Sequence, residues 1–323
     1  MLNISKEQLE GNLDYLILIE ALQNAFQEKY IVPIRHHHNY QNPKEGIEST
    51  LLLMPAWQAG EYLGVKMVTV SPKNGQYNLP SIHGIYTLFD AQKGMPLAQI
   101  NATTLTAQRT AATSALASSF LSKKNSKTLL MVGTGALAPE LIQAHAVVRP
   151  IETVYVWGRN LEKAKAVVNS ITKHFQKIEK KKIEFFPIEN IEAGIEKADI
   201  ISCATLSSTP LILGKKLKAG QHLDLVGAYR PDMREADDEA ILRSSVFVDT
   251  YDGMNESGDI SIPLESGILK KENVCADLFE LCRSEKTGRK DNEQITFFKS
   301  VGHALEDLTA AKLIYEKLSP SEF

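Results

Sequence analysis

The segment Gly133–Ala138 has the spacing G-x-G-x-x-A and joins a short apolar run, Thr128–Val132, to a segment of helical periodicity. In such a turn the first glycine permits a tight bend, the second lets another molecule approach the backbone, and the small sixth residue lets helix and strand pack closely. The free N–H groups at the start of the helix suit a pyrophosphate. The pattern predicts a dinucleotide site, with an ordinary strand-to-helix turn as the alternative. The predicted contacts are Gly133, Thr134, Gly135 and Ala136.

The next apolar run, Thr153–Trp157, is followed by Gly158, Arg159 and Asn160. Many dinucleotide-binding folds carry an acid at this place, where it bonds the ribose hydroxyls. An arginine there suits a 2'-phosphate instead. We therefore predict that Arg159 and Asn160 contact the cofactor, and that NADPH is preferred while NADH binds more weakly. The alternative for Arg159 is a solvated side chain at a helix start.

Three cations lie among apolar or small residues in the first part of the chain: Arg35, Lys66 and Arg109. Lys66 stands in the strand-like run Gly64–Val68, where an unpaired buried ammonium would be costly. A substrate carboxylate would be a suitable partner for these cations. A salt bridge to a structural acid is an equally good alternative for each one alone. Taken together, they predict an anion clamp.

The triplet His36-His37-His38 is the candidate metal ligand set. Successive side chains of a strand point to opposite faces, so only His36 and His38 could converge. No adjacent carboxylate or cysteine completes a site. We predict no metal.

Composition limits the class of protein. A net charge of -3 in 323 residues gives no basic field, which argues against nucleic acid as a partner. No run is long and apolar enough for a membrane span, and the N-terminus does not read as a signal peptide. The three cysteines predict reduced thiols and a cytoplasmic protein. The run Glu179–Lys182 is predicted to be a solvated helix end.

The elements that must position these residues change in character near residue 125. Before it, turns separate strand-like runs and predict an antiparallel or mixed sheet. The strands are Ser49–Met54, Tyr62–Val70 and Ile85–Phe89, with a hairpin turn at Asp90–Gly94. Apolar residues between Leu13 and Phe26 predict a preceding helix, and residues 105–121 an alanine-rich helix that follows.

After residue 125 short strands alternate with helices, which predicts a parallel sheet with right-handed crossovers. The strands are Thr128–Val132, Thr153–Trp157, Ile183–Ile188, Asp199–Ala204, His222–Val226 and Val246–Asp249. A last amphipathic helix is predicted at Gly302–Leu318. The fold class is α/β, with a Rossmann-type parallel-sheet domain and an α+β domain.

Several segments together resemble the ornithine cyclodeaminase and mu-crystallin family over essentially the whole chain. The matching segments are Leu53–Pro55, Gly64–Lys66 with Ser71-Pro72, Leu105–Ala115, Gly133–Gly135, Asp224–Glu235 and Lys299–Asp307. The resemblance implies a substrate-binding and dimerisation domain at 1–121 with 301–323, a Rossmann domain at 122–300, and a homodimer. It also implies that Arg35, Lys66 and Arg109 hold a substrate carboxylate, and we expect Thr110, Thr205 and Gly227 to contact the cofactor.

One position departs from part of this family. Ornithine cyclodeaminases and related alanine dehydrogenases carry an aspartate after the Val226-Gly227 pair, where it engages the substrate amine. This chain has Tyr229 there, as a predicted substrate contact, and continues like the ketimine reductases of the mu-crystallin branch. The resemblance therefore favours reduction of a cyclic ketimine carboxylate, namely 1-pyrroline-2-carboxylate to L-proline or 1-piperideine-2-carboxylate to L-pipecolate.

Alternatives to this reaction remain open. They are an ornithine cyclodeaminase, an alanine or opine-type dehydrogenase, and a crystallin-like binding protein without activity. Lys66, Arg109 and His83 are the predicted catalytic residues, with His83 donating or relaying a proton. A structural hydrogen bond is the alternative for His83.

Overall fold

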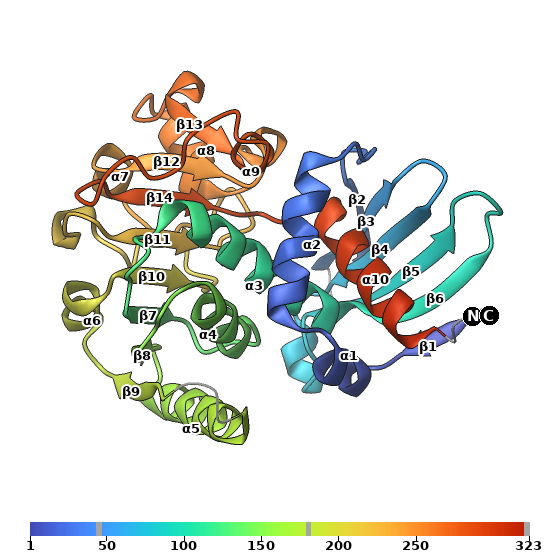
Figure 1. Cartoon of the computed structure of the whole chain (residues 1–323), viewed down its shortest axis with the longest axis horizontal. Helices are drawn as coiled ribbons and strands as arrows, with labels where there is room; N and C mark the ends of the chain where they lie inside the picture. Colours follow the sequence, from blue (N-terminus) through green and yellow to red (C-terminus); the bar gives the residue numbers. More distant parts are fainter. Residues whose placement is uncertain (43–46, 179–181, 320–323) are drawn as a thin grey trace. The chain divides into compact units, whose positions relative to one another are not determined.

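The computed structural model describes residues 1–42, 47–178 and 182–319, which form two compact units. Unit 1 comprises Met1–Arg109 with His303–Phe323, and unit 2 comprises Thr110–Gly302. Helix α3 (Ala102–Leu121) contributes to both, because the division falls inside it (Figure 1). Residues 320–323 of the predicted C-terminal segment, and 179–181 of the predicted helix end, lie outside the described residues.

Unit 1 is built on a six-stranded sheet in the order β1-β6-β5-β4-β3-β2. Strand β1 pairs with β6 in parallel, and the other pairs are antiparallel. The strands are β1 (Leu2–Ile4), β2 (His36–Asn42), β3 (Ile47–Trp57), β4 (Tyr62–Val70), β5 (Ile82–Asp90) and β6 (Pro96–Asn101). The predicted hairpin turn follows β5, where the Asp90 carboxylate accepts from the N–H groups of Gln92 and Lys93.

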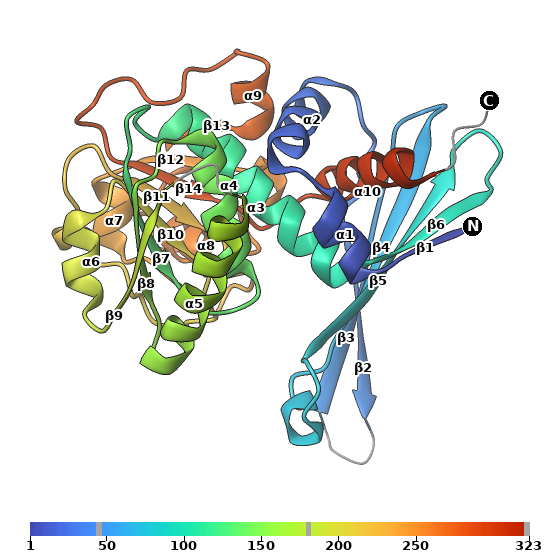
Figure 2. The same ribbon diagram turned by 60° about the horizontal axis from the view of Figure 1, so that its bottom comes forward.

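Helices cover one face of this sheet. Helix α10 (Ala304–Leu318) packs on β3, β4 and β5 and on α2 (Tyr15–Gln27), as Figures 1 and 2 show. Beneath it lie the buried residues Gly64 and Lys66 of β4 and their cross-strand partners on β5. A short helix, α1 (Lys6–Asn12), and a 3-10 turn (Asn74–Tyr77) complete the unit.

Unit 2 contains an eight-stranded sheet in the order β13-β12-β14-β11-β10-β7-β8-β9, with every pair parallel. Its strands are β7 (Thr128–Val132), β8 (Thr153–Trp157), β9 (Glu184–Ile188), β10 (Ile200–Cys203), β11 (His222–Leu225), β12 (Ser245–Val248), β13 (Val274–Asp277) and β14 (Thr296–Lys299). From β7 the strand order runs outward through β8 and β9 on one side and through β10 and β11 on the other, so the order reverses between β7 and β10, the switch point at which α/β folds bind ligands.

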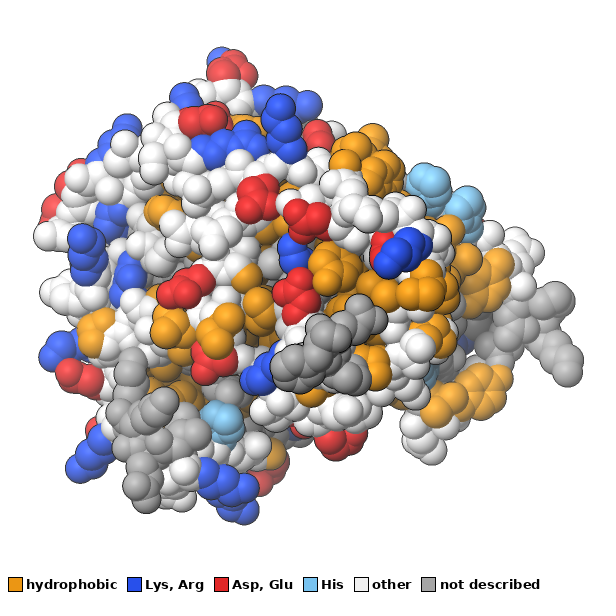
Figure 3. Space-filling model, turned by 45° about the vertical axis from the view of Figure 1, so that its right-hand side comes forward, with side chains coloured by type: hydrophobic (Ala, Val, Ile, Leu, Met, Phe, Trp, Pro, Cys, Tyr) orange, Lys and Arg blue, Asp and Glu red, His pale blue; other side chains and the backbone are white. Residues whose placement is uncertain are grey.

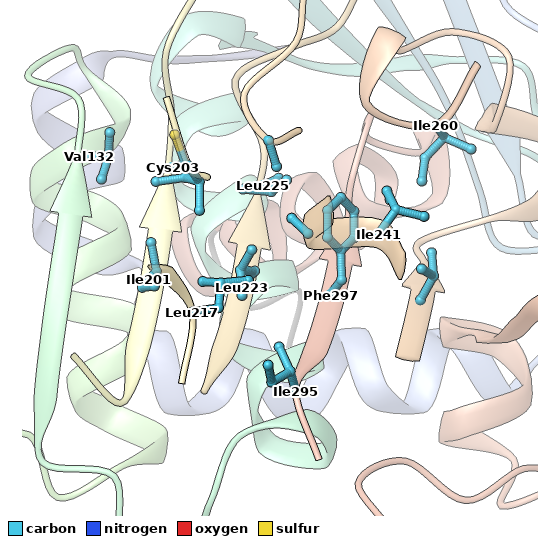
Figure 4. Close-up of a cluster of buried hydrophobic side chains, with 14 of the residues drawn as sticks. Val132, Ile201, Cys203, Leu217, Leu223, Leu225, Ile241, Ile260, Ile295 and Phe297 are labelled. Carbon is cyan, nitrogen blue, oxygen red and sulfur yellow. The ribbon is translucent and has the colours of Figure 1, made fainter. Parts of the chain in front are cut away.

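Helices lie on both faces of this sheet (Figure 2). They are α4 (Leu137–Val148), α5 (Leu161–Ile178), α6 (Ile191–Lys197), α7 (Asp238–Leu242), α8 (Gly258–Glu265) and α9 (Leu278–Cys282), with 3-10 turns at Gly214–Lys216, Tyr251–Gly253 and Lys271–Asn273. Strands buried on both faces are continuously apolar, which explains runs such as Thr128–Val132. On one face, Val132, Ile201 and Leu223 pack with Ile241 and Ile260 from helices α7 and α8 (Figure 4).

The predicted fold class is confirmed, and β7 and β8 have the predicted bounds. Strands β1, β2, β6, β13 and β14 were not predicted. They are short or polar, and they are recognisable as strands only through their pairing with neighbouring strands in the sheet.

The two compact units divide the chain inside helix α3. The divisions lie at 109/110 and 302/303, whereas the sequence predicts domains of 1–121 with 301–323 and 122–300. The physical reason is that the end of α3 packs within unit 2. Arg149 donates to the Ser118 carbonyl oxygen at 2.7 Å, and Arg289 donates to that of Leu121 at 2.6 Å.

Candidate active site and cofactor site

The glycine-rich turn stands at the carboxyl end of β7. Gly133 has φ +127°, and a Cβ there would lie 2.5 Å from the Ala204 carbonyl oxygen, so only glycine fits. A Cβ on Gly135 would meet no atom within 4 Å, and this residue is exposed. Ala136 precedes α4 without a side-chain cap, so the first N–H groups of the helix are not capped by this residue. The turn therefore has the open backbone approach and donor groups that a pyrophosphate requires.

Thr205 and Gly227 follow β10 and β11 at the same edge of the sheet. The Thr205 N–H and hydroxyl both donate to Glu235, at 2.7 and 2.8 Å, and the Gly227 N–H donates to it at 2.8 Å. The structure thus brings these two predicted cofactor residues together through a buried acid that the sequence reasoning missed. Thr110, a third, is buried in helix α3.

Arg159 and Asn160 follow β8. Gly158 brings this strand end against the glycine-rich turn, because a Cβ on it would lie 2.6 Å from the Thr134 side chain. Arg159 is exposed and has no ion pair within the described part of the chain. Asn160 accepts from the Lys163 N–H at 3.2 Å, so its side chain caps the start of helix α5.

A buried cluster of four charged side chains lies in unit 1. Lys66 Nζ is 2.7 Å from Asp307 Oδ2, Arg109 Nε donates to Asp307 Oδ1 at 2.9 Å, and Arg109 Nη1 lies 2.5 Å from Glu306 Oε2. The two carboxylates start helix α10, and each has 0% exposed side chain. The structural-acid alternative for Lys66 and Arg109 is therefore realised, and two positive charges meet two negative ones.

The cluster shifts the pKa of its members in a consistent way. Burial lowers the pKa of Lys66 to about 8, with Asp307 opposing this shift and Arg109 and Arg35 adding to it. Burial works against ionisation of Asp307, but Arg109 and Lys66 hold its carboxyl pKa below the ordinary value. The charge of Arg35 therefore acts on Lys66, while Lys66 and Arg109 share the carboxylate of Asp307.

His83 does not join this cluster. Lys66 pairs with Tyr86 across β4 and β5, and His83 pairs with Thr69. Side chains alternate along a strand, so His83 points to the face opposite Lys66, where it is exposed. The donation or relay of a proton by His83 stays a prediction. Tyr229, the predicted substrate contact in unit 2, is half-buried in the turn after Gly227 and Ala228.

The histidine triplet lies on β2, where His36 and His38 share a face, with ring centroids 6.0 Å apart. Among the described residues, no group of three histidine, cysteine or acidic side chains could hold a metal.

None of the described helices is long and apolar enough to cross a membrane. On the face shown in Figure 3, basic and acidic side chains are interspersed.

Comparison with known proteins identifies the family. The sequence profile of the ornithine cyclodeaminase/mu-crystallin family matches residues 5–322. The chain belongs to this family. It is 37% identical to the Delta(1)-pyrroline-2-carboxylate reductase of Colwellia psychrerythraea over 98% of this chain and 99% of that protein.

Two solved structures superpose on nearly the whole chain. The Delta(1)-pyrroline-2-carboxylate reductase of Thermococcus litoralis, in complex with NADH and L-proline, superposes with a TM-score of 0.89 at 35% identity, covering 98% of this chain and 97% of that one. An archaeal alanine dehydrogenase, described as a dimer with bound NAD, gives 0.88 at 26% identity, covering 98% and 95%.

Sequence reasoning did not single out Glu306, Asp307 or Glu235. All three lie in segments that carry the family resemblance, Lys299–Asp307 and Asp224–Glu235. That location was the available signal, but it does not say which distant residue each acid contacts.

Proposed function

We propose that this protein is an NAD(P)H-dependent reductase of cyclic ketimine carboxylates. It reduces 1-pyrroline-2-carboxylate to L-proline and 1-piperideine-2-carboxylate to L-pipecolate. The observation that carries the proposal is the meeting of Lys66 and Arg109 at the buried carboxylate of Asp307, with the charge of Arg35 acting on Lys66. The reductases of this name among the relatives and solved structures support it.

The residues of unit 1 bind and orient the substrate carboxylate. Glu306 and Asp307 hold Arg109 and Lys66 in place and balance their charges. Arg35, whose charge acts on Lys66, adds a third cation to this part of unit 1. A bound reduced nicotinamide supplies a hydride to the C=N carbon of the substrate. A protonated imine is already electrophilic, so the protein mainly holds the substrate in one orientation.

The turn after β7 and the end of β8 hold the cofactor. Gly133 and Gly135 admit the pyrophosphate, and Arg159 binds the 2'-phosphate, which gives NADPH its preference over NADH. Thr134, Ala136 and Asn160 line this part of the site. Thr205 and Gly227 flank the nicotinamide half, and Thr110 contacts the cofactor from helix α3.

A second copy of the chain covers the free face of the unit 1 sheet. Helix α10 covers the face of Lys66, whereas Leu53, Val65, Met67 and Ile85 share the opposite face and are partly exposed, Ile85 at 45%. An apolar sheet face of this kind favours association. The archaeal alanine dehydrogenase dimer supports this homodimer. In sedimentation experiments, Ile85→Lys should shift the profile to that of the monomer.

The three free cysteines support a cytoplasmic location.

A substrate panel tests the reaction. NADPH absorbance is followed with each imine acid, and ammonia release is measured with L-ornithine. We expect reduction of both imines and no ammonia, because Tyr229 stands where cyclodeaminases hold the amine with an acid, and a tyrosine lacks the carboxylate that would bind the ammonium and take up its proton. Ammonia release without imine reduction would make it a cyclodeaminase, and no turnover of any of them would make it a binding protein.

Two variants test the carboxylate clamp. Arg35→Gln should lower kcat/KM for the imine by about tenfold or more, since a charged hydrogen bond is lost. Arg109→Lys should also be poor, because an ammonium cannot reproduce the planar fork that reaches Glu306 and Asp307. Both should retain NADPH affinity. Normal kcat/KM in Arg35→Gln would remove Arg35 from the substrate site.

A further inference from the structure

Glu235 is a buried acid that holds two loops at the carboxyl edge of the unit 2 sheet. Its side chain has no exposed surface. Oε1 accepts from the N–H and the hydroxyl of Thr205, after β10. Oε2 accepts from the N–H groups of Gly227, at 2.8 Å, and Ala228, at 3.2 Å, after β11. One carboxylate therefore fixes the ends of two adjacent strands.

The loops that Glu235 holds are packed backbone to backbone. A Cβ on Gly227 would lie 2.1 Å from the Thr205 nitrogen and 2.6 Å from Glu235 Oε1. On the other side, a Cβ on Gly133 would lie 2.5 Å from the Ala204 carbonyl oxygen and 3.6 Å from Thr205. The loop after β10 thus stands between the glycine-rich turn and the loop after β11. A shift of Thr205 would be transmitted to both neighbours.

Two charged residues, Lys299 and Asp259, fix the position of Glu235. Lys299 Nζ, at the end of β14, lies 4.0 Å from Glu235 Oε2 and 3.0 Å from Asp259 Oδ2. The Glu235 N–H donates to Asp259 Oδ1 at 2.7 Å. Burial raises the pKa of Glu235, while Lys299 opposes that rise. Four donors from Thr205, Gly227 and Ala228 converge on the two oxygens, an arrangement that suits the ionised carboxylate.

We propose that Glu235 is the positioning residue for the nicotinamide half of the cofactor. It holds the loops after β10 and β11 against the glycine-rich turn, so that the surface for the ring exists before the cofactor binds. This inference rests on the proposed function, because it takes the dinucleotide to bind across the switch point between β7 and β10. Glu235 acts through Thr205 and Gly227.

The test separates the two halves of the cofactor. Dissociation constants are measured for NADPH and for 2'-phospho-ADP-ribose, which lacks the nicotinamide, with the wild type, Glu235→Gln and Glu235→Asp. In Glu235→Gln an amide NH2 faces donors of one loop, so NADPH affinity should fall by about tenfold or more while the affinity for the fragment changes less than about threefold. Glu235→Asp keeps the charge and should recover part of the loss.

Asp199→Asn is the matched control. Asp199 Oδ2 also accepts from two backbone N–H groups, those of Lys127 and Thr128, but at the opposite edge of the same sheet. The Asp199→Asn substitution should lower the melting temperature without changing the ratio of the dissociation constants for NADPH and for the fragment. Equal losses for NADPH and the fragment in Glu235→Gln, or an unchanged ratio in both Glu235 variants, would overturn the proposal. If Glu235→Gln does not fold, the ratio in Glu235→Asp decides. A wild type that binds neither ligand would overturn the proposed function, and this inference with it.

Discussion

The Lys66 ammonium on strand β4 lies 2.7 Å from the Asp307 carboxylate in the first turn of helix α10, and both side chains are buried. Asp307 also accepts from Arg109 on helix α3. One carboxylate near the C-terminus therefore joins a strand and a helix from the first third of the chain. It connects the folding of unit 1 to the candidate substrate site, because the same two cations are those proposed to orient the substrate.

Asp307→Asn should strongly destabilise unit 1. The change leaves Lys66 and Arg109 buried with half of their compensating charge, and breaking a buried ion pair of this kind costs about 3–5 kcal/mol. Urea unfolding followed by circular dichroism measures the loss. Glu61→Gln is the control, because its pair with Lys312 is partly exposed and should contribute no more than about 1 kcal/mol. Equal losses for the two variants would contradict the role given to Asp307.

Carboxylate binding should weaken as pH rises through about 8. The pKa of Lys66 is lowered to about 8, so the ammonium that helps to attract the anion loses its proton above that value. The dissociation constant of pyrrole-2-carboxylate should be flat below this pH and rise above it by up to about tenfold per pH unit. In Lys66→Arg the rise should move to higher pH, because a guanidinium keeps its proton. Identical profiles for the two proteins would exclude Lys66 as the titrating group.

Arg159→Ala should reduce affinity for NADPH and leave affinity for NADH nearly unchanged. Arg159 is exposed and directly follows Gly158, which lies against Thr134 of the glycine-rich turn. Its charged contact with a 2'-phosphate would contribute roughly 1.5–3 kcal/mol, or about tenfold or more in affinity. Fluorescence titration with both cofactors measures the two constants. Equal losses would reject the assigned role of Arg159.

Alanine substitutions at the two glycines of the turn should have different effects, one on stability and the other on cofactor affinity. Gly133→Ala places a Cβ 2.5 Å from the Ala204 carbonyl oxygen at φ +127°, so it should destabilise unit 2, with about 1–3 kcal/mol from backbone strain alone. Gly135→Ala meets no atom within 4 Å and should unfold like the wild type. Its Cβ stands where the pyrophosphate approaches, so NADPH affinity should fall by about tenfold. Unchanged affinity in Gly135→Ala would place the dinucleotide elsewhere.

Part of the fold and part of the candidate site could be predicted from short stretches of the sequence. The apolar runs of β7 and β8, the G-x-G-x-x-A turn between β7 and α4, and the three unusual cations are all visible in neighbouring residues. They follow from the requirements of a strand buried on two faces, a helix start that receives an anion, and charged groups in apolar surroundings. Strands β13 and β14 escaped prediction, because four residues each give too short a pattern to distinguish strand from loop.

The sequence by itself determined which residue types could bind a dinucleotide and an anion, and the order of strands and helices that would carry them. Tertiary structure alone decided which acids meet Lys66 and Arg109, on which face of the sheet His83 lies, and that Glu235 holds the loops of Thr205 and Gly227. The physical reason is that a buried charge requires a partner of opposite charge, but the neighbouring sequence does not show which residue that partner is. The partner is chosen by strand register and by the packing of helices that are distant in the chain.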